Sequence, residues 1–354
     1  MPDPLYLPVL KGRQGEFAAL AAIQPATRRH TLPLVEIVPG PADDPVTVRH
    51  NIDRTARKLR TWAGGRLLLD AGLIPTDVAL HDGFGAVGYS AITTLNLGVS
   101  ATPVVRLNDE PLALADASQV HADCGGGVAL RLSVEDMDED SEDVDQALTD
   151  VLQRLKVDCT DADLVLDVGA VNGDLAVRAA SRLVTDLLRD LSNIGDWRQI
   201  IVTAGAFPVD LSAVERWVLG EPRRYDADLW DRVRGRRRIP RTPTYGDYAV
   251  AHPVLASGPP FPAAPQLRYT VANRWLTLKG GRNDPRGHEQ FYEICETIAA
   301  HSDFAGAALG KADERIAHPR AHGHGPGNAS TWRELGTTHH LDFVLRRITS
   351  LGEP

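Results

Sequence analysis

Charged residues close several short apolar runs of the sequence, and these positions are the first candidates for chemistry. The runs PLVE, LLLD, PVVR, VALR and LVLD end in Glu36, Asp70, Arg106, Arg131 and Asp167, and Lys11 closes an earlier run less regularly. Arginine and lysine bind phosphate or carboxylate groups through charge-assisted hydrogen bonds. Carboxylates ligate divalent metals or act as general acids and bases. The pattern therefore predicts a polar site that holds an anionic, phosphate-bearing, nucleotide-like ligand.

The residue types divide this candidate site into two roles. The predicted ligand-binding residues are Lys11, Arg13, Arg106, Arg131 and Asp247. The candidates for acid–base catalysis or metal ligation are Glu36, Asp70 and Asp167. If the protein is an enzyme, metal-assisted phosphoester chemistry suits this set, with a divalent metal as the candidate cofactor. The structural alternatives are a ring of salt bridges that only closes the site, or charges that merely mark strand ends.

The elements that must position these residues alternate between buried strands and helices. Strands are expected at 5–10, 32–38, 66–70, 102–107, 128–132, 163–168 and 199–203, with a weaker eighth at 248–251. Helices are expected at 15–23, 46–62, 109–121, 141–156, 173–191 and 211–219. This alternation predicts a parallel sheet, and eight units predict a TIM-like (β/α)8 barrel whose strands all end at one rim.

An open, doubly wound sheet is the alternative fold. The residues after the first strand, KGRQG, match neither the GxGxxG nor the Walker A pattern, which disfavours it. We expect a barrel over residues 1–255 with an Arg- and Pro-rich insertion at about 220–265. Residues 266–354 would form an extension on the barrel, with a strand hairpin at 267–279 and helices at 287–301 and 330–351. Thr331 and Glu334 have the spacing of a capping box in the last helix.

The composition limits the classes of function. The 354 residues carry a net charge of −9, which argues against a general nucleic-acid binder. A local basic run remains an alternative nucleic-acid contact; its residues are Arg234, Arg236, Arg237 and Arg238. No apolar segment is long enough to span a membrane, no signal peptide is recognisable, and three cysteines lack CxxC spacing. These features predict a cytoplasmic protein without a membrane partner.

Histidines cluster at positions 318, 322 and 324 in a loop rich in Gly and Pro. A solvated loop is the favoured interpretation over a zinc site, because no fourth ligand is suitably spaced. His339 and His340 are adjacent, so on a helix they point about 100° apart and do not share one metal.

The opening motif YLPVLKGRQGE, followed by PLVEIVP, carries a resemblance to a known family. Later segments that fit are YGDY at 245–248, Trp332 and Arg333, Gly336, and His339 with His340. Over nearly its whole length the chain resembles the bacterial and phage beta protein family, named for a phage T4 protein. The resemblance brings no catalytic residues. It implies a setting of phage defence or phage–host conflict, with a phage or defence-system protein as partner.

The sequence therefore leaves two main hypotheses for the function. One is a protein that binds a small anion or nucleotide at the strand-end rim, with its enzymatic activity left open. The other is a non-catalytic interaction protein of a phage-related complex. Charges that pair fully with one another would favour the second, and an open pocket with unpaired charges would favour the first.

Overall fold

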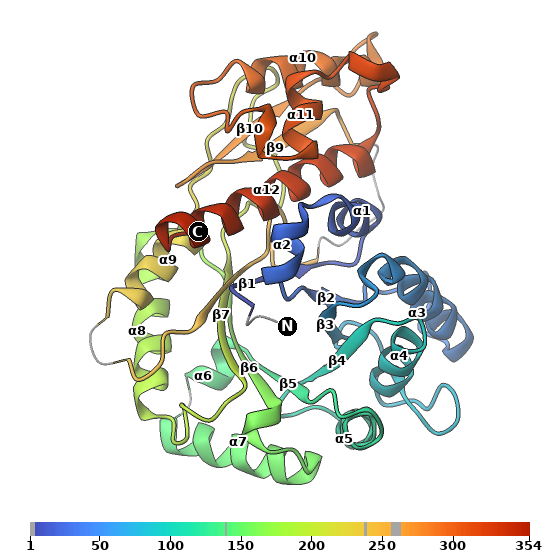
Figure 1. The fold of residues 1–354 in the computed structure, drawn as a ribbon, viewed down its shortest axis with the longest axis vertical. Helices are drawn as coiled ribbons and strands as arrows, with labels where there is room; N and C mark the ends of the chain where they lie inside the picture. Colours follow the sequence, from blue (N-terminus) through green and yellow to red (C-terminus); the bar gives the residue numbers. More distant parts are fainter. Residues whose placement is uncertain (1–3, 139, 237–238, 256–262) are drawn as a thin grey trace.

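Eight parallel strands close into a barrel in the order of the sequence (Figure 1). The computed structural model describes residues 4–138, 140–236, 239–255 and 263–354. The strands are β1 (Tyr6–Leu10), β2 (Leu34–Glu36), β3 (Arg66–Asp70), β4 (Ser100–Val105), β5 (Val128–Leu132), β6 (Ala162–Ala170), β7 (Gln199–Gly205) and β8 (Thr244–Asp247). The TIM-like barrel expected from the sequence is confirmed.

Alternation along the strands decides which side chains face the barrel interior. The inner cluster contains Leu7, Val9, Leu32, Leu34, Leu68, Val104, Ala129, Val165, Ile201 and Tyr248. Side chains two residues apart on a strand share a face. Glu36 follows Leu34 by two positions, and Asp70 follows Leu68 in the same way. Position along the strand thus aims the terminal charges toward the barrel axis.

Helices cover the outside of the barrel. They are α1 (Gln14–Ala22), α2 (Pro25–His30), α3 (Pro45–Leu59), α4 (Ala86–Leu95), α5 (Pro111–Cys124), α6 (Val134–Met137), α7 (Ser141–Leu155), α8 (Asp174–Asp190) and α9 (Tyr225–Arg234). Short 3-10 turns add η1 (Arg60–Trp62) and η2 (Cys159–Asp161). On α8, Val177, Val184 and Leu188 recur at helical spacing and are buried in the main core.

Two expected elements differ in the structure. Residues 211–219 form turns and not a helix. The eighth strand is Thr244–Asp247, whereas the expected segment 248–251 turns across the barrel end. Its apolar side chains are buried, as those of a strand would be. Ala249, however, has a φ of 50°, which does not fit a strand. The expected insertion at 220–265 contains α9 and β8, so its first part belongs to the barrel.

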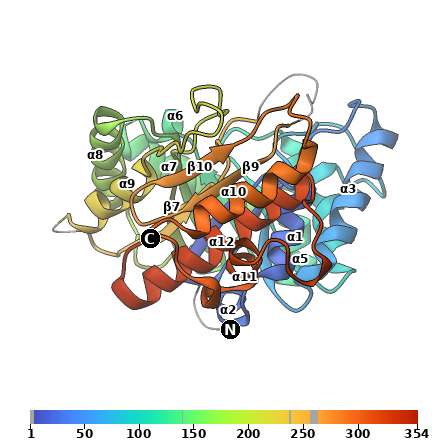
Figure 2. The same cartoon turned by 90° about the horizontal axis from the view of Figure 1, so that it is seen from above.

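The C-terminal residues form a subdomain beside the barrel. It contains the hairpin β9 (Gln266–Thr270) and β10 (Trp275–Lys279), then η3 (Gly287–Glu289), α10 (Gln290–Ala299), η4 (Ala307–Leu309), α11 (Lys311–Ala317), η5 (Ala321–Gly323) and α12 (Ala329–Leu351). Figure 2, seen from the subdomain side, shows the hairpin and these helices lying along the barrel wall. The side chain of Asn328 caps α12, which corrects the capping box expected at Thr331 and Glu334.

Helix α12 joins the two parts of the molecule, as Figure 1 shows. Trp332 and Leu335 from its first turns belong to the subdomain core. Leu341, Val344 and Leu345, further along, belong to the barrel core. Among the described residues, no helix combines the length and apolarity that a membrane crossing requires.

Candidate functional site

Six charged side chains predicted from strand ends meet at the carboxyl ends of the barrel strands. With Tyr248 they form a connected cluster that we call the rim network. Its members are Lys11, Glu36, Asp70, Arg106, Arg131, Asp167 and Tyr248. Three cations and three carboxylates make the cluster electrically balanced. The structure brings these residues together, and the catalytic and ligand-binding roles assigned to them remain predictions.

Arg131 lies at the centre of the rim network. Its Nε donates to Asp167 at 2.9 Å, and its Nη2 donates to Asp167 at 2.5 Å and to the Tyr248 hydroxyl at 2.7 Å. Its Nη1 donates to Glu36 at 2.9 Å and to Asp70 at 2.5 Å. A guanidinium has five N–H donors. These five bonds leave Arg131 with no free donor for a ligand.

Lys11 is also engaged. Its ammonium forms an ion pair with Glu36 and donates to the backbone carbonyl of Pro253. It lies 5.0 Å from the centre of the Tyr248 ring. The chain after β8 therefore supplies two contacts to the network, and Lys11 links the first strand to the last.

Arg106 has a buried nitrogen without a hydrogen-bond partner in the described part of the chain. Its Nη2 donates to Asp70 at 2.7 Å, while Nη1 has no hydrogen-bond partner among the described residues. That nitrogen is buried, and a Cβ placed on Gly72 would lie 2.2 Å from it. The loop after β3 therefore covers this nitrogen of Arg106.

Two guanidiniums of the rim network favour the ionised form of the Asp70 carboxyl. Burial alone would raise the pKa of Asp70, but Arg106 and Arg131 outweigh burial and lower this pKa to about 2. Burial and the Asp167 carboxylate raise the pKa of Tyr248 well above its ordinary value. A carboxyl with a pKa near 2 is a poor general acid and a weak base at neutral pH.

Asp247 lies outside the rim network, and its ligand-binding role stays a prediction. It shares a face of β8 with Tyr245, which packs in the core outside the barrel. Its carboxylate accepts hydrogen bonds from the Tyr6 hydroxyl at 2.6 Å and from the Tyr245 hydroxyl at 3.0 Å, and it lies 2.8 Å from His340 Nε2. The Asp247 carboxylate therefore faces His340 of α12.

The contacts of Asp247 continue into the subdomain. Thr270 Oγ1 lies 2.8 Å from His340 Nδ1, and the Thr270 carbonyl lies 2.8 Å from His339 Nε2. His339 Nδ1 pairs with Asp313 at 2.9 Å. All these side chains are buried. The two adjacent histidines therefore serve one buried polar joint between barrel and subdomain, each with its own carboxylate.

Arg13 lies beside the rim network in a separate cavity of about 570 Å³. Three guanidiniums line it, from Arg13 after β1, Arg268 on β9 and Arg333 on α12. The remaining lining residues are Gln14, Gly15, Val250, Ala263, Gln266, Ala329, Ser330 and Trp332. We call this cavity the arginine pocket. It opens at the strand-end rim, because Arg13 and Val250 follow the ends of β1 and β8.

Two glycines of the KGRQG motif shape this pocket. Gly12 has a φ of +60°, and a Cβ there would lie 2.6 Å from the Glu36 carbonyl oxygen. A Cβ on Gly15 would lie 2.5 Å from the Ser330 carbonyl oxygen and 2.8 Å from Arg333 Cβ. The motif therefore turns the chain tightly after β1 and lets the start of α1 pack against the start of α12.

The arginine pocket carries more positive than negative charge. Arg268 Nη1 and Arg333 Nη1 both donate to the Val250 carbonyl, at 2.7 and 2.9 Å. Burial lowers the pKa of both guanidiniums; the neighbouring Arg333 lowers that of Arg268 further, and Glu16 opposes both changes. Glu16 accepts a hydrogen bond from the backbone N–H of Arg13 at 3.2 Å. Among the described residues, one carboxylate lies near three guanidiniums, so the pocket has a net positive charge that a bound anion would neutralise.

A family model described as Beta protein matches residues 6–346. The chain belongs to the Beta protein family. The match confirms the resemblance seen in the opening motif and in the later segments. No protein of the curated set matches the chain.

Solved structures that resemble this member of the Beta protein family share little sequence with it. Triosephosphate isomerase from Bartonella henselae has 10% identity and a TM-score of 0.34, over 68% of this chain and 90% of that chain. A putative aldo-keto reductase from Pseudomonas aeruginosa has 10% identity and a TM-score of 0.31, over 56% and 68%. A second such structure has 12% identity and a TM-score of 0.27, over 52% and 80%. The barrel assignment rests on the observed strand order.

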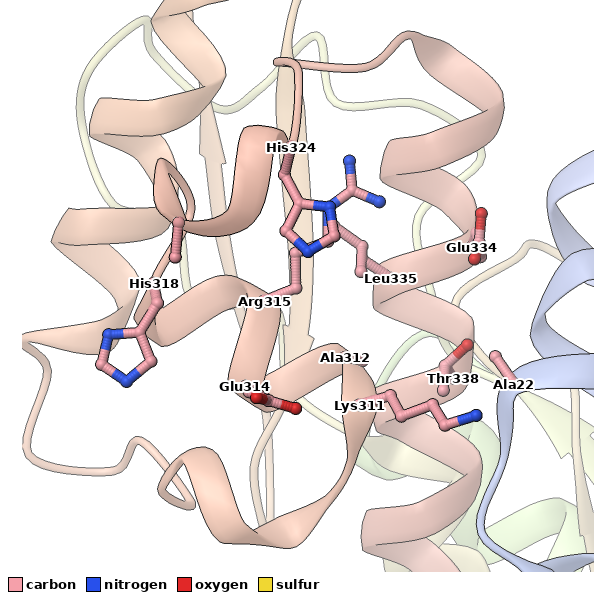
Figure 3. A pocket seen from close by; sticks show the side chains of 11 residues that line it. Ala22, Lys311, Ala312, Glu314, Arg315, His318, His324, Glu334, Leu335 and Thr338 are labelled. Carbon is pink, nitrogen blue, oxygen red and sulfur yellow. The ribbon is translucent and has the colours of Figure 1, made fainter.

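A further cavity of about 410 Å³ lies between α11, α12 and the end of α1 (Figure 3). His318 and His324 line it, together with Arg315, Glu314 and Glu334. In Figure 3 His324 lies beside Arg315, whereas His318 points away from them. Within the described part of the chain, no three His, Cys, Asp or Glu side chains are grouped to hold a metal. This histidine loop therefore gives no support for a zinc site.

The basic run lies at the end of α9. Arg234 contacts the Gly352 carbonyl and lies 3.8 Å from both Asp231 and Glu353. Arg236 donates to the Ser181 hydroxyl at 3.5 Å. The other two residues of the predicted nucleic-acid contact, Arg237 and Arg238, lie outside the described residues. Nucleic-acid binding by this run stays a prediction.

Sequence reasoning assigns no site role to Tyr248 or Arg333. Tyr248 was placed in a strand, although its position two residues beyond Gly246 marks an inward-facing site past the strand end. Arg333 belongs to the family segment near the C-terminus but was given no role, because its approach to Arg13 depends on how α12 packs.

Proposed function

We propose that this protein binds a small anionic, phosphate-bearing ligand of nucleotide size at the strand-end rim of its barrel. The arginine pocket is the proposed site. The observation that carries the proposal is the meeting of Arg13, Arg268 and Arg333 around one cavity, where Glu16 is the single nearby carboxylate of the described residues.

The volume and lining of the arginine pocket support a ligand larger than a bare phosphate. About 570 Å³ lies within the range of small-molecule sites. Guanidiniums would bind the phosphate oxygens in a bidentate manner. Gln14, Gln266 and Ser330 offer neutral hydrogen-bonding groups, and Val250 adds an apolar surface for the organic part.

The rim network supports binding in preference to catalysis. Glu36, Asp70 and Asp167 all pair with cations, so none is left free to take a metal or to move a proton. We propose that the network holds the barrel mouth rigid and orients the loops after β1 and β8. Metal-assisted phosphoester chemistry at these three carboxylates is an alternative that their pairing with cations does not favour.

Isothermal titration tests the proposal with AMP, GMP, CMP, UMP and orthophosphate as probes and adenosine as the uncharged comparison. At least one nucleotide should bind, and its nucleoside should bind at least about tenfold more weakly, since one charge-assisted hydrogen bond contributes about 1.5–3 kcal/mol. Arg13→Ala and Arg333→Ala should each weaken nucleotide binding about tenfold or more.

Arg178→Ala is the matched control for this titration. Arg178 is exposed on α8, far from the pocket lining, and has no partner among the described residues. It should leave affinity unchanged. Absence of binding by every phosphate probe, or equal affinity in Arg13→Ala, Arg333→Ala and the control, would reject the proposal. We also propose a phage–host setting for this binding, which rests on family membership alone.

A further inference from the structure

A second cationic cavity lies at the opposite end of the barrel, where the strands begin. Its volume is about 680 Å³. Its floor is formed by residues at the start of the strands whose side chains face the barrel interior. They are Leu5, Leu32, Arg66, Gln199 and Thr244. Its walls include Arg28 and Arg29 on α2, Trp62, Arg198 and Arg241. We call it the N-terminal mouth.

The charges of this mouth are unbalanced. Five arginines line it, and the carboxylate of Asp163 is the one acid that pairs with any of them among the described residues. Arg198 Nη2 lies 2.9 Å from Asp163, and Arg66 shares the same carboxylate. The whole chain has a net charge of −9, so this concentration of arginine runs against its overall composition.

Backbone carbonyls hold two of the remaining guanidiniums in place. Arg28 donates to the carbonyls of Thr61 and Ala63 at 2.9 and 3.1 Å, and its guanidinium lies 4.2 Å from the centre of the Trp62 ring. Arg241 donates to the Arg198 carbonyl at 3.1 Å. Carbonyl groups orient a guanidinium without neutralising its charge, so these side chains are arranged in advance for an anion.

Arg29 also lines the N-terminal mouth. It is exposed and has no partner among the described residues. Burial, together with the charge of Arg198, lowers the pKa of Arg66, although Asp163 opposes this change. An incoming anion would relieve this uncompensated positive charge. Leu32, Pro25 and Ile200 line the same cavity and would contact the apolar part of an organic ligand.

We propose that the N-terminal mouth binds a small organic molecule that carries two or more phosphate groups, such as a nucleoside di- or triphosphate. Several guanidiniums spread around one recess need an anion whose charges are spread as well. A recess of this volume, closed at its floor by the barrel interior, admits a small molecule in preference to a folded chain. This site is separate from the arginine pocket, and neither depends on the other.

The test is isothermal titration of the full chain in an Arg333→Ala background, so that the arginine pocket contributes little. The probes are ATP, ADP, AMP and inorganic tripolyphosphate. ATP and ADP should bind more tightly than AMP, and tripolyphosphate should compete with ATP. Arg29→Glu should weaken ATP binding at least about tenfold, and Arg28→Gln should weaken it in the same direction. The control Arg178→Glu makes the same charge change on α8 and should alter the affinity less than about twofold.

A thermal unfolding curve for each variant separates lost binding from lost folding. Arg29→Glu should keep the parent midpoint, because the side chain makes no contact that folding needs. Absence of binding by ATP and tripolyphosphate, or ATP binding that Arg29→Glu and Arg28→Gln leave unchanged, would overturn the proposal. Failure here would leave AMP binding in the unmutated arginine pocket intact, so the two proposals fail separately.

Discussion

Arginine serves two different purposes at the strand-end rim. Arg131 directs all five of its donors at protein groups and lies in a cluster of balanced charge. Arg268 and Arg333 share one backbone carbonyl, and no carboxylate of the described residues lies within ion-pair distance of either guanidinium. The residue type alone does not separate these cases. The number of satisfied donors separates structural arginines from those available to a ligand.

Arg131→Ala should therefore destabilise the fold strongly. Removing this guanidinium leaves Asp167 buried without its cationic partner and Asp70 with Arg106 alone, which costs about 3–5 kcal/mol of unfolding free energy. Arg131→Lys should recover only part of the loss, because an ammonium cannot make the planar fork of contacts. Urea unfolding measures both changes. A loss below about 1 kcal/mol in Arg131→Ala would contradict a structural role for the rim network.

The lowered pKa of Asp70 predicts a pH dependence of stability. The folded pKa of about 2 lies below the unfolded value near 3.9, so ionised Asp70 stabilises the protein above pH 4 and loses that contribution as the pH falls toward 2. The unfolding free energies of wild type and Asp70→Asn should converge by about 2 kcal/mol between pH 5 and pH 2. Urea titrations at several pH values measure this convergence. A gap that stays constant over this range would show that Asp70 is not linked to folding in this way.

At the scale of elements, the close approach of α12 to α1 and to β9 shapes the arginine pocket. Glycines at the two contact surfaces make that approach close. Gly15 faces the Ser330 carbonyl, and a Cβ on Gly336 would lie 2.7 Å from the Arg268 carbonyl oxygen. The pocket is therefore a product of helix packing around two glycines and of the loop that carries Val250.

Gly336→Ala should lower stability, contrary to the usual effect of alanine in a helix. Alanine normally stabilises a helix interior by about 1 kcal/mol relative to glycine. Here the added methyl meets a backbone oxygen that cannot move freely, so we expect a net loss of about 1–3 kcal/mol. Nucleotide affinity should fall as well, because the displaced backbone belongs to Arg268.

Ser350→Ala, at an exposed position of the same helix, serves as the control and should change the free energy by less than about 0.5 kcal/mol. Chemical denaturation gives the stabilities and calorimetric titration gives the affinities. A stabilised Gly336→Ala would refute the close packing of α12 on β9.

The sequence predicts elements better than contacts between elements. The barrel and the six rim charges follow from local patterns, because strand alternation alone sets which side chains face inward. The sequence places Tyr248 in a strand because residues 248–251 are apolar and buried, although they form a turn at the barrel end. Local patterns do not bring Arg333 to Arg13, since the two are 320 positions apart in the chain. They also do not pair Asp247 with His340, which lies on the last helix.

At the scale of the whole molecule, barrel and subdomain share one helix and one buried polar joint. The first turns of α12 complete the subdomain core, and later turns complete the barrel core. His340 and Asp247 pair across this boundary at 2.8 Å, fully shielded from water. The two parts should therefore fold as a single unit, although the sequence suggests a barrel with an added extension.

Differential scanning calorimetry should accordingly give one unfolding transition, with calorimetric and van't Hoff enthalpies that agree. His340→Ala should lower the midpoint without splitting this transition, because Asp247 then loses a buried partner while the α12 packing persists. Two separate transitions in the wild-type protein would contradict the shared core.

The central claim is that Arg13, Arg268 and Arg333 bind a phosphate group. The most direct measurement is the anomalous diffraction of crystals soaked in tungstate, a heavy tetrahedral oxyanion. The account predicts a tungsten peak in the arginine pocket within hydrogen-bonding reach of these guanidiniums, which disappears in Arg333→Ala crystals soaked in the same way. An empty pocket in crystals that bind tungstate elsewhere, or a peak that survives in Arg333→Ala, would contradict it.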